Sequence, residues 1–350
     1  MSERPRIVIV GAGAIGSSIA GWIAPKYKNL SLLARGTTLE VIRNHGLKFY
    51  LKGGRSTAAT LPVRAVGSLA EVPSPDIVVI AVKNYDLEAT ARELRDQLGN
   101  SEPAVVALQN GVLNQKVLPS YFTRIIYGVV CYNAFRDAPG EVGHDSRGYI
   151  IIGTPMNDLQ NEMHVVKNIF DLGLRCVITD RLQDAVHCKL VINLANALNT
   201  LVGFQRKPMK SFNILVHLTF SLYLEGIQLL QAAGFHEHSL GPIPSWRSIK
   251  IGSKLPPFLV SPLYRSRTKS VGPNSMAQDV FGGNDTTELE TLNGYMLNLA
   301  RKTGFPTPIN ETIYQVAKER FKPGFEPISE EELWAKIRVK VKQVRAGTGG

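Results

Sequence analysis

A glycine-rich turn close to the N-terminus constrains this chain more than any other feature. Four apolar residues, Ile7–Val10, lead directly into Gly11, Gly13 and Gly16, and apolar residues at helical spacing follow. The pattern predicts a buried strand, a tight turn and the N-terminus of a helix in one uninterrupted segment.

Each glycine in this turn has a physical reason. Gly11 lets the chain turn, Gly13 lacks the Cβ that would block a pyrophosphate, and Gly16 allows helix and strand to pack closely. The phosphate would lie on the backbone N–H groups of Ala14, Ile15 and Gly16, where the helix dipole favours negative charge. We predict that these residues bind a dinucleotide.

The residue after the second predicted strand indicates which dinucleotide binds. An NAD site usually has Asp or Glu about 20 positions beyond the glycines, where it binds the ribose 2′-hydroxyl. Here the predicted strand Leu30–Ala34 is followed by Arg35. An arginine pairs with a 2′-phosphate, which a carboxylate would repel. The position of Arg35 favours NADP over NAD, and an ordinary surface arginine is the alternative.

Two further polar side chains follow predicted parallel strands. Lys83 comes directly after the apolar run 76–82, and Asn110 follows the run 104–108. The carboxyl ends of strands in doubly wound sheets face the ligand. We expect Lys83 to meet a cofactor phosphate and Asn110 to lie near the nicotinamide, although Asn110 and Gly111 could simply form a turn.

The remainder of the first half predicts more strands. Segments 125–132 and 148–152 are apolar, and the first is expected to be the antiparallel strand often added to such sheets. The turn-rich segment 46–66 indicates a hairpin-like excursion. Around Thr179 the pattern becomes mainly helical. We therefore expect an α/β domain over residues 1–179 and a mainly α-helical domain over residues 180–350.

The helical half begins with an unusual helix, predicted over 181–201. Lys189, Asn193 and Asn196 are spaced i, i+4 and i+7 within it, which places them on one stripe of an otherwise apolar helix. A lysine and two amides on one face are uncommon in a core, so this stripe is a candidate site. A surface lysine is the weaker alternative, because the neighbours of Lys189 are apolar.

Three later segments complete the second half. A helix is predicted over 286–303, with Glu288 in its first turn. Ser329 and Glu332 form a capping box for the last helix. The segment near 238–274 is basic and rich in proline, contains no acidic residue, and is assigned no regular structure. A long segment of this kind is either functional or a surface insertion.

Composition narrows the classes of partner. The net charge of +11 suits anionic ligands, and nucleic acid is not expected, because the basic segments contain no nucleic-acid motif. The start MSERPR lacks the apolar segment of a signal peptide, and the three cysteines form no C-x-x-C pair. We expect a cytoplasmic protein with no metal, no membrane partner and a small anionic substrate. The apolar segment 212–230 is interrupted by polar residues, so a core helix is favoured over a membrane span.

Several motifs occur together in a characteristic order. They are VGAGAIG, LLAR, AVKNYD, LQNG, CKLVINLANALNTL, NSMAQD and TTELETLNG. In this respect the chain resembles the ketopantoate reductase (2-dehydropantoate 2-reductase) family, NADPH-dependent enzymes of pantothenate biosynthesis. The resemblance extends over nearly the whole chain. It implies an N-terminal Rossmann-type domain, a helical C-terminal domain, and a 2-keto acid as substrate.

The resemblance also implies roles for individual residues. Lys189 would be the general acid, Asn193 would hold the substrate, and Glu288 would accept from a substrate hydroxyl near the lysine. Ser275 would bind the substrate carboxylate. Arg35 and Lys83 match residues that bind the adenosine phosphate, and Asn110 matches the one next to the nicotinamide.

Two departures from the family pattern keep the substrate open. Where the family commonly has a second asparagine, eight residues after the lysine, this chain has Ala197, and Asn196 would compensate. The segment between Ser275 and Glu288 is one residue longer than expected. The alternatives are a related reductase of another 2-keto acid and a non-catalytic NADP(H)-binding redox sensor. A homodimer is left open.

Overall fold

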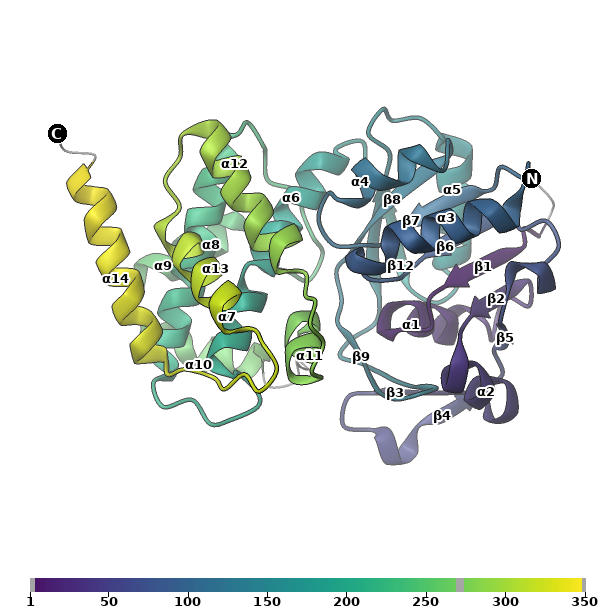
Figure 1. Ribbon diagram of the computed structural model, residues 1–350, viewed down its shortest axis with the longest axis horizontal. Coiled ribbons are helices and arrows are strands. Elements are labelled where there is room, and N and C mark those ends of the chain that lie inside the picture. The colour runs from purple at the N-terminus through teal and green to yellow at the C-terminus, as the bar shows by residue number, and fades with distance from the viewer. Residues whose placement is uncertain (1–3, 269–273, 348–350) are drawn as a thin grey trace. The chain divides into compact units, whose positions relative to one another are not determined.

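The structure is a computed structural model that describes residues 4–268 and 274–347. Residues 1–3, 269–273 and 348–350 lie outside the described residues, and with them Lys269 and Pro273 of the basic segment. The chain divides into two compact units, Met1–Leu182 and Gln183–Gly350. Figure 1 shows strands and helices in the first unit and helices in the second.

The first unit is built on a large mixed sheet. Among the described residues its strand order is β12-β11-β8-β7-β6-β1-β2-β5. The strands are β1 (Ile7–Val10), β2 (Leu30–Leu33), β5 (Arg64–Val66), β6 (Ile77–Ile80), β7 (Ala104–Ala107), β8 (Ile125–Val130), β11 (Tyr149–Gly153) and β12 (Arg175–Ile178). The central strands are buried along their whole length, as expected for parallel strands covered on both faces.

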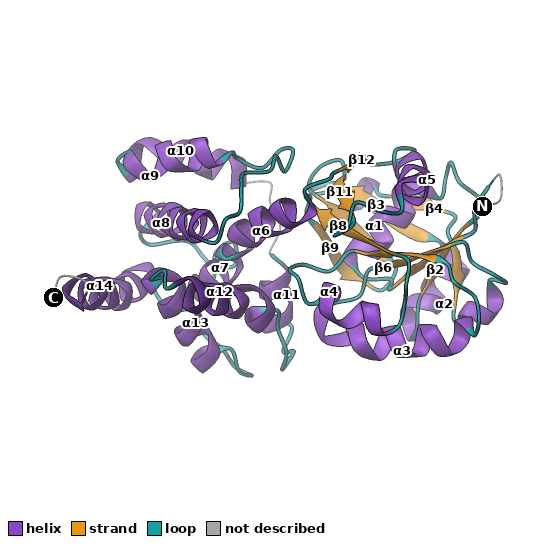
Figure 2. Ribbon diagram, turned by 90° about the horizontal axis from the view of Figure 1, so that it is seen from above, coloured by secondary structure: helices purple, strands orange, loops and turns teal. Residues whose placement is uncertain are grey.

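Helices cover both faces of this sheet. They are α1 (Ala14–Ile23), α2 (Gly36–His45), α3 (Leu87–Leu98), α4 (Asn114–Val117) and α5 (Gln160–Phe170). Figure 2 shows α3 on one face of the sheet and α5 on the other. The arrangement confirms the expected Rossmann-type α/β architecture, because strands and helices alternate and the first six strands of the order from β5 to β8 are parallel.

The prediction for strand 125–132 was wrong in direction. β8 pairs in parallel with β7, and Ala107 is in register with Tyr127. The strand that reverses direction is β11, which is antiparallel to β8 and carries β12 in parallel on its other side. Both β8 and β11 are apolar and almost entirely buried, so their sequences do not distinguish the two directions.

A second, smaller sheet packs against α1. Its strands are β4 (Ala59–Leu61), β3 (Leu47–Leu51), β10 (Glu141–His144) and β9 (Ala134–Ala138), in that order. The antiparallel pairing of β3 and β4 confirms the hairpin-like excursion. Trp22 of α1 meets this sheet through Phe49 and His144, with ring centroids 5.5 Å and 4.9 Å away. The sequence did not indicate β9 and β10.

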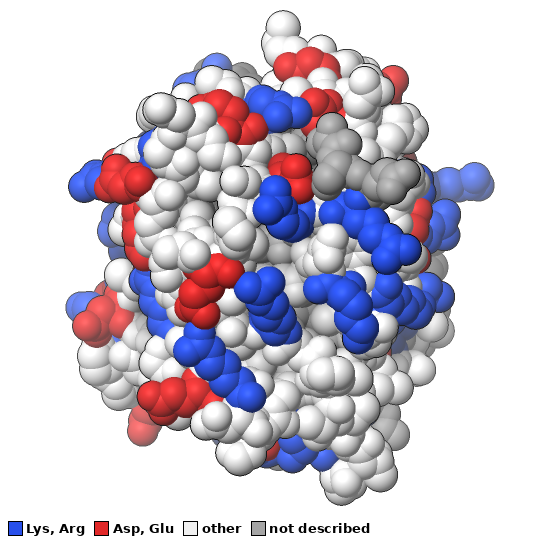
Figure 3. All heavy atoms as spheres, turned by 90° about the vertical axis from the view of Figure 1, so that its right-hand side faces the viewer, with Lys and Arg blue, Asp and Glu red and all other residues white. Residues whose placement is uncertain are grey.

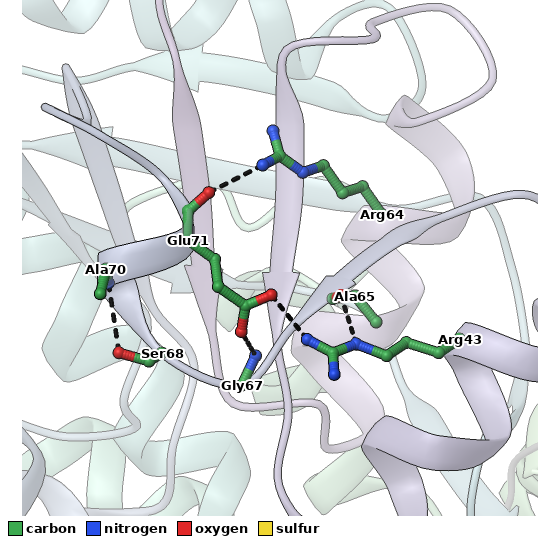
Figure 4. Close-up of polar contacts among 7 residues, drawn as sticks. All are labelled: Arg43, Arg64, Ala65, Gly67, Ser68, Ala70 and Glu71. Carbon is green, nitrogen blue, oxygen red and sulfur yellow. Dashed lines mark hydrogen bonds and ion pairs between the residues drawn. The ribbon is translucent and has the colours of Figure 1, made fainter.

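The edge strand β5 is fastened by a cluster of polar contacts, drawn in Figure 4. The carboxylate of Glu71 accepts hydrogen bonds from the backbone N–H of Gly67 (2.7 Å) and from the Arg43 guanidinium (2.6 Å). Arg43 also donates to the Ala65 carbonyl, and Arg64 donates to the Glu71 carbonyl (2.7 Å). β5 is an edge strand, so one of its sides has no neighbouring strand among the described residues. These side-chain bonds help to hold it in the sheet.

Basic side chains are numerous on the surface. On the face in Figure 3, Lys and Arg gather across the middle and lie among scattered Asp and Glu. Several cations of the first unit form ion pairs with carboxylates, such as Arg55 with Glu141 (2.7 Å) and Arg124 with Glu162 (2.5 Å). Part of the positive charge therefore serves the unit's own structure.

The described residues of the second unit form helices and loops. The α-helices are α6 (Leu182–Asn193), α7 (Ala195–Val202), α8 (Phe212–Ala232), α9 (Trp246–Lys254), α10 (Pro257–Thr268), α11 (Ser275–Phe281), α12 (Tyr295–Thr303), α13 (Pro308–Arg320) and α14 (Glu330–Gly347). A π-helical turn, Glu290–Gly294, leads into α12. The expected α-helical second half is confirmed.

Helix α8 lies in the middle of this unit, and α9 and α10 form a layer on one side of it (Figure 2). Among the described residues, Leu182–Val202 and Phe212–Ala232 are apolar and long enough to cross a bilayer by composition alone. Most of each segment is buried within the protein. Packing among helices therefore accounts for their apolar character.

The segment near 238–274, for which the sequence predicts no regular structure, is mainly helical over its described residues. α9 and α10 occupy most of this segment. Pro256 lies between the two helices, Pro257 occupies the first position of α10, and Pro262 is exposed within it. Proline is tolerated at the first position of a helix, where its missing N–H has no intrahelical acceptor. The prolines divide this segment into helices and do not prevent them.

A buried carboxyl group joins α8 to α13. Glu225 is only 7% exposed, and its two oxygens accept hydrogen bonds from the backbone N–H groups of Ile309 (2.9 Å) and Asn310 (2.8 Å). These N–H groups belong to the first turn of α13, which has no acceptors of its own there. Burial raises the pKa of Glu225 to about 8, against the opposing effect of the two hydrogen bonds.

The glycine turn shows the predicted close packing. Gly11 has a φ of +105°, a backbone conformation that favours glycine. A Cβ added to Gly16 would lie only 2.0 Å from the carbonyl oxygen of Gly11, which is too close for any side chain. A Cβ on Gly13 would meet nothing within 4 Å. Gly11 and Gly16 therefore serve the fold, whereas the small size of Gly13 is not required by it.

Replacing Gly16 with Ala should lower the free energy of unfolding by about 2 kcal/mol, because the backbone must move to admit the new Cβ. Gly13→Ala is the matched control, with space for a Cβ and a φ of −79°, and its stability should stay within about 0.5 kcal/mol of the parent. Urea unfolding measures both variants. Equal stabilities would contradict the close contact.

The raised pKa of Glu225 predicts a pH dependence of stability. Between the ordinary carboxyl pKa of 4.5 and the folded value of about 8, the folded state binds more protons than the unfolded state. The free energy of unfolding should therefore fall as pH rises through this range. Glu225→Gln should remove this part of the slope and cost about 1 kcal/mol near pH 5, because the amide nitrogen cannot accept.

Urea unfolding of the parent and the Gln variant at several pH values tests this prediction. The difference between the two proteins isolates Glu225 from other titrating groups. The same slope in both proteins would show that Glu225 is already ionised when folded.

Candidate active site

The glycine turn prepares the N-terminus of α1 for an anion. Gly13 precedes the first residue of α1, Ala14, and no side chain caps the helix. The N–H groups of Ala14, Ile15 and Gly16 belong to the first turn, where a helix has no acceptors of its own. The open space at Gly13 lies at the same place. This local arrangement suits a phosphate, as the sequence predicted.

Arg35 and Lys83 lie at the same edge of the sheet as the glycine turn. β1 pairs in parallel with β2 on one side and with β6 on the other, so their carboxyl ends are neighbours. Arg35 follows β2 and precedes α2, and Lys83 follows β6 and precedes the short 3-10 helix Asn84–Asp86. The two cations thus flank the glycine turn on strands to either side.

The guanidinium of Arg35 forms an ion pair with Glu93 of α3. Both side chains are exposed, at 63% and 46%. An exposed pair of this kind contributes little to stability and can be exchanged for another anion at small cost. The sequence alone gave no indication that Glu93 lies there, since the two residues belong to different βα segments.

A buried amide connects the loops after β6 and β7. The Gln109 side-chain nitrogen donates to the carbonyl oxygens of Ile80 (2.8 Å) and Val82 (3.1 Å). The Asn84 amide donates to the backbone carbonyl of Asn110 (2.9 Å). Sequence reasoning missed the roles of Gln109 and Asn84, which fix the segments that carry Lys83 and Asn110. The sequence signal for Gln109 was a glutamine directly after the apolar run 104–108.

In the second unit, Lys189 and Asn193 lie one turn apart on α6. Lys189 is partly buried and Asn193 is 6% exposed, while Cys188 and Leu190 on either side of the lysine are almost fully buried. The ammonium group therefore extends from an apolar helix, and its surroundings are less polar than bulk water. Asn196 lies beyond the end of α6, in α7.

The single helix predicted over 181–201 is interrupted at Leu194. The backbone there keeps helical dihedral angles (φ −55°, ψ −35°), and the Leu194 N–H is shared between the carbonyls of Leu190 (3.0 Å) and Val191 (3.2 Å). The Leu194 carbonyl accepts a hydrogen bond from the side-chain amide of Asn293 (3.4 Å). A residue of the π-helical turn therefore contacts the junction between Asn193 and Asn196.

Ser275 and Glu288 are brought together by the fold. The Ser275 hydroxyl, at the start of α11, donates to a carboxylate oxygen of Glu288 at 3.4 Å, and Glu288 is only 2% exposed. Asn274 caps α11 and donates to the Asn196 backbone carbonyl (3.3 Å). Ser275, Glu288 and the backbone of Asn196 thus occupy one region of the second unit.

The sequence pattern predicts Glu288 in the first turn of a helix, but in the structure Glu288 lies just before the helix. The helix begins one residue later, at Leu289, whose N–H donates to the Thr287 hydroxyl (3.2 Å). The π-helical turn then follows directly. π-helical turns are rare in proteins, and those that occur are often found at functional sites. The position of this turn next to Glu288 agrees with that tendency.

Comparisons with known proteins agree with this arrangement. A sequence model described as ketopantoate reductase PanE/ApbA matches residues 7–157, and its C-terminal counterpart matches residues 181–321. A 2-dehydropantoate 2-reductase from Pyrococcus horikoshii is 25% identical over 317 residues, which cover 90% of this chain and 97% of the relative. One from Halobacterium salinarum is 27% identical and covers 89% of this chain and 98% of the relative.

Solved structures show the same fold. The crystal structure of a 2-dehydropantoate 2-reductase from Geobacter metallireducens has a TM-score of 0.72 and 25% identity, and it covers 90% of this chain and 99% of its own. A D-mandelate dehydrogenase complex with NADH and anilino(oxo)acetate has a TM-score of 0.70 and covers 93% and 98%, but its 17% identity supports the fold alone. By the two family matches together, which extend over both units, this chain belongs to the ketopantoate reductase family.

Proposed function

We propose that this protein reduces the keto group of ketopantoate to give pantoate, with NADPH as the hydride donor. The observation that carries the proposal is the region of the second unit where Ser275 contacts the buried Glu288 and where Asn274, next to Ser275, contacts the Asn196 backbone. Asn196 lies at the start of α7, directly after the helix that bears Lys189 and Asn193. A hydroxyl and a carboxylate in contact, with an ammonium and an amide on the preceding helix α6, suit a substrate that has a carboxylate, a hydroxyl and a carbonyl oxygen. Membership of the family supports the same substrate.

The nucleotide would bind at the first unit. The residues proposed to hold it are Gly11, Gly13, Ala14, Ile15 and Gly16 at the pyrophosphate. Bound NADPH supplies the hydride that is added to the keto carbon of the substrate. A relative in fold, D-mandelate dehydrogenase, has been solved with NADH, which supports a nicotinamide cofactor here. Arg35 is the reason to propose NADPH, since its guanidinium can exchange Glu93 for the 2′-phosphate.

The other cofactor residues belong to the loops joined by Gln109. Lys83 would bind a cofactor phosphate, and Asn110 would lie next to the nicotinamide. The hydrogen bond between Asn84 and the Asn110 carbonyl fixes the second loop relative to the first. Both ends of the nucleotide would therefore meet segments that are held in place before binding.

Lys189 is proposed as the general acid. Hydride addition to the keto carbon leaves negative charge on the oxygen, and that oxygen must gain one proton to become the alcohol. The Lys189 ammonium can donate this proton and is left as a neutral amine, which regains a proton from water because the side chain is only partly buried. Before the transfer, its positive charge stabilises the developing oxyanion.

The remaining residues would orient the substrate. Ser275 would donate to the substrate carboxylate, and Asn193 would bind its hydroxyl or carboxylate oxygen. Glu288 would accept from the substrate hydroxyl, for which its contact with Ser275 positions it. Asn196 is proposed to replace the asparagine that the family has at position 197, where this chain has the fully buried Ala197.

A related reductase of another 2-keto acid is the second candidate. It is favoured by Ala197, since one amide of the substrate site is missing, and by the likeness in fold to an enzyme solved with anilino(oxo)acetate. A non-catalytic NADP(H) sensor is less well supported. Such a sensor would need the glycine turn and Arg35, but not Ser275, Glu288 and Lys189 together.

Steady-state oxidation of NADPH tests the proposal and separates the candidates. We expect turnover with ketopantoate to exceed that with other branched 2-keto acids. Lys189→Ala should lower kcat by about 100-fold or more and leave NADPH binding nearly unchanged. Turnover only on another keto acid would favour the second candidate, and NADPH binding without any turnover would favour the sensor. An active Lys189→Ala variant would exclude the lysine as the acid.

The role of Arg35 is tested by reversing its charge. Arg35→Asp should weaken NADPH binding by about 10-fold to 100-fold, because a charge-assisted contact with the 2′-phosphate is replaced by repulsion. NADH binding should change little. Glu93→Gln is the matched control and should leave NADPH binding equal or tighter. Fluorescence titration measures the dissociation constants, and equal losses for both nucleotides in Arg35→Asp would contradict the assignment.

A further inference from the structure

The outer face of α9 and α10, here called the α9–α10 face, exposes many apolar side chains. Its members are Ile251 (52% exposed), Leu255 (44%), Phe258 (63%), Leu259 (57%) and Leu263 (58%). They make up five of the nine large apolar side chains that are exposed among the described residues. Exposed apolar side chains that gather in this way mark an interaction surface.

The opposite side of these helices fixes them to α8. Trp246 and Ile249 of α9 are buried, and Gly252 lies so close that a Cβ would be 2.3 Å from the Phe220 ring. On α10, the Ser261 hydroxyl donates to the Asn213 side chain at 2.6 Å. Figure 2 shows α9 and α10 as the outermost layer beyond α8. The apolar face is therefore presented on rigid, well-packed helices.

Positively charged side chains occur along the same two helices as the exposed apolar ones. Residues 238–278 contain no Asp or Glu, and Arg247, Lys254 and Arg267 are exposed. A hollow of about 600 Å³ lies next to α9, and its lining includes Arg247, Lys250, Ile251 and Lys254. One acidic residue, Glu237, also lines the hollow. Its carboxylate accepts a hydrogen bond from the Trp246 N–H at 2.6 Å, so it caps α9.

We propose that the α9–α10 face binds the surface of an anionic lipid bilayer. Phe258, Leu259 and Leu263 would enter the boundary between headgroups and acyl chains, and the cations around the hollow would contact lipid phosphates. Each Lys or Arg near an anionic surface contributes roughly fivefold in affinity. This inference goes beyond the proposed function, because it needs none of the proposed catalytic and binding residues.

Charge distinguishes this occupant from a second copy of the chain. A two-fold interface would place the same face of each copy against the other, and cations would meet cations. An anionic bilayer offers charge of the opposite sign over the whole face. From the sequence alone no membrane partner is expected, because its most apolar segment, 212–230, is interrupted by polar residues.

Co-sedimentation of the full chain with lipid vesicles tests the proposal. Vesicles of phosphatidylcholine with about 30% phosphatidylserine should bind at least about fivefold more protein than vesicles of phosphatidylcholine alone. Raising the salt from about 0.1 M to about 0.5 M should weaken the binding. Equal binding to both kinds of vesicle, or none to either, would overturn the proposal.

Two double variants of the α9–α10 face, each with a control variant elsewhere, separate insertion of apolar side chains from simple charge attraction. Phe258→Ser with Leu259→Ser leaves the net charge unchanged and should reduce binding at least about fivefold. The control for this variant is Met156→Ser, which replaces an apolar residue of the first unit that is 82% exposed. This control should bind vesicles normally. Arg247→Glu with Lys254→Glu should abolish binding, whereas Arg92→Glu with Lys116→Glu, the same change in net charge elsewhere, should reduce it far less.

Three outcomes would contradict the proposal. Equal losses in both charge-reversal variants would mean that net charge alone attracts the protein. A dimer in solution that becomes a monomer in the Phe258→Ser, Leu259→Ser variant, without vesicle binding by the parent, would assign the face to a second copy. Normal binding by that same variant would exclude insertion. NADPH oxidation in the absence of vesicles, which the α9–α10 variants should retain, distinguishes failure of this proposal from failure of the proposed function.

Discussion

A buried network of hydrogen bonds connects the helices of the second unit, and it begins where the Asn293 amide donates to the Leu194 carbonyl. Asn293 is fully buried and also donates to the Asn310 side chain at 2.8 Å, and Asn310 in turn donates its N–H to Glu225. The chain of bonds thus joins α6, the π-helical turn, α13 and α8. A buried polar network of this kind restricts how the helices can pack, because a donor left without a partner would be costly. The Asn293 amide nitrogen is paired in this way, whereas its side-chain oxygen is buried without a hydrogen-bond partner among the described residues. The network fixes the junction after Asn193 and the segment that begins with Glu288.

In the first unit, the central parallel strands were predictable, because each is a local apolar run and because parallel pairing brings their carboxyl ends to one edge of the sheet. Apolar runs bounded by turns located β1, β6 and β7, and parallel pairing then required Arg35 and Lys83 to lie near the glycine turn. The direction of β8 was not predictable, since a fully buried strand has the same composition in either direction. Contacts such as Gln109 with Val82 depend on side-chain conformation, which no pattern of residue types specifies.

The second unit was less predictable, because helix packing decides which residues meet. The spacing of Lys189 and Asn193 correctly placed them one turn apart on a helix, but the interruption at Leu194 follows from a residue almost one hundred positions away. The contact between Ser275 and Glu288 likewise depends on how α11 docks on α7 through Asn274. Proline content concealed α9 and α10, since composition alone does not tell a helix start from a loop.

The same network has a consequence for how the second unit folds. Helical proteins usually fold fast, because most of their contacts are local in sequence. Here two of the bonds, Asn293 with Leu194 and Asn310 with Glu225, join residues that are far apart in the sequence, so each needs a long loop to close before it can form. These bonds add long-range contacts to a unit whose other contacts include many local ones between neighbouring helices. We expect its transition state to include α8 and α13 already paired, with slow, cooperative folding that resembles a mixed α/β domain more than a simple helix bundle.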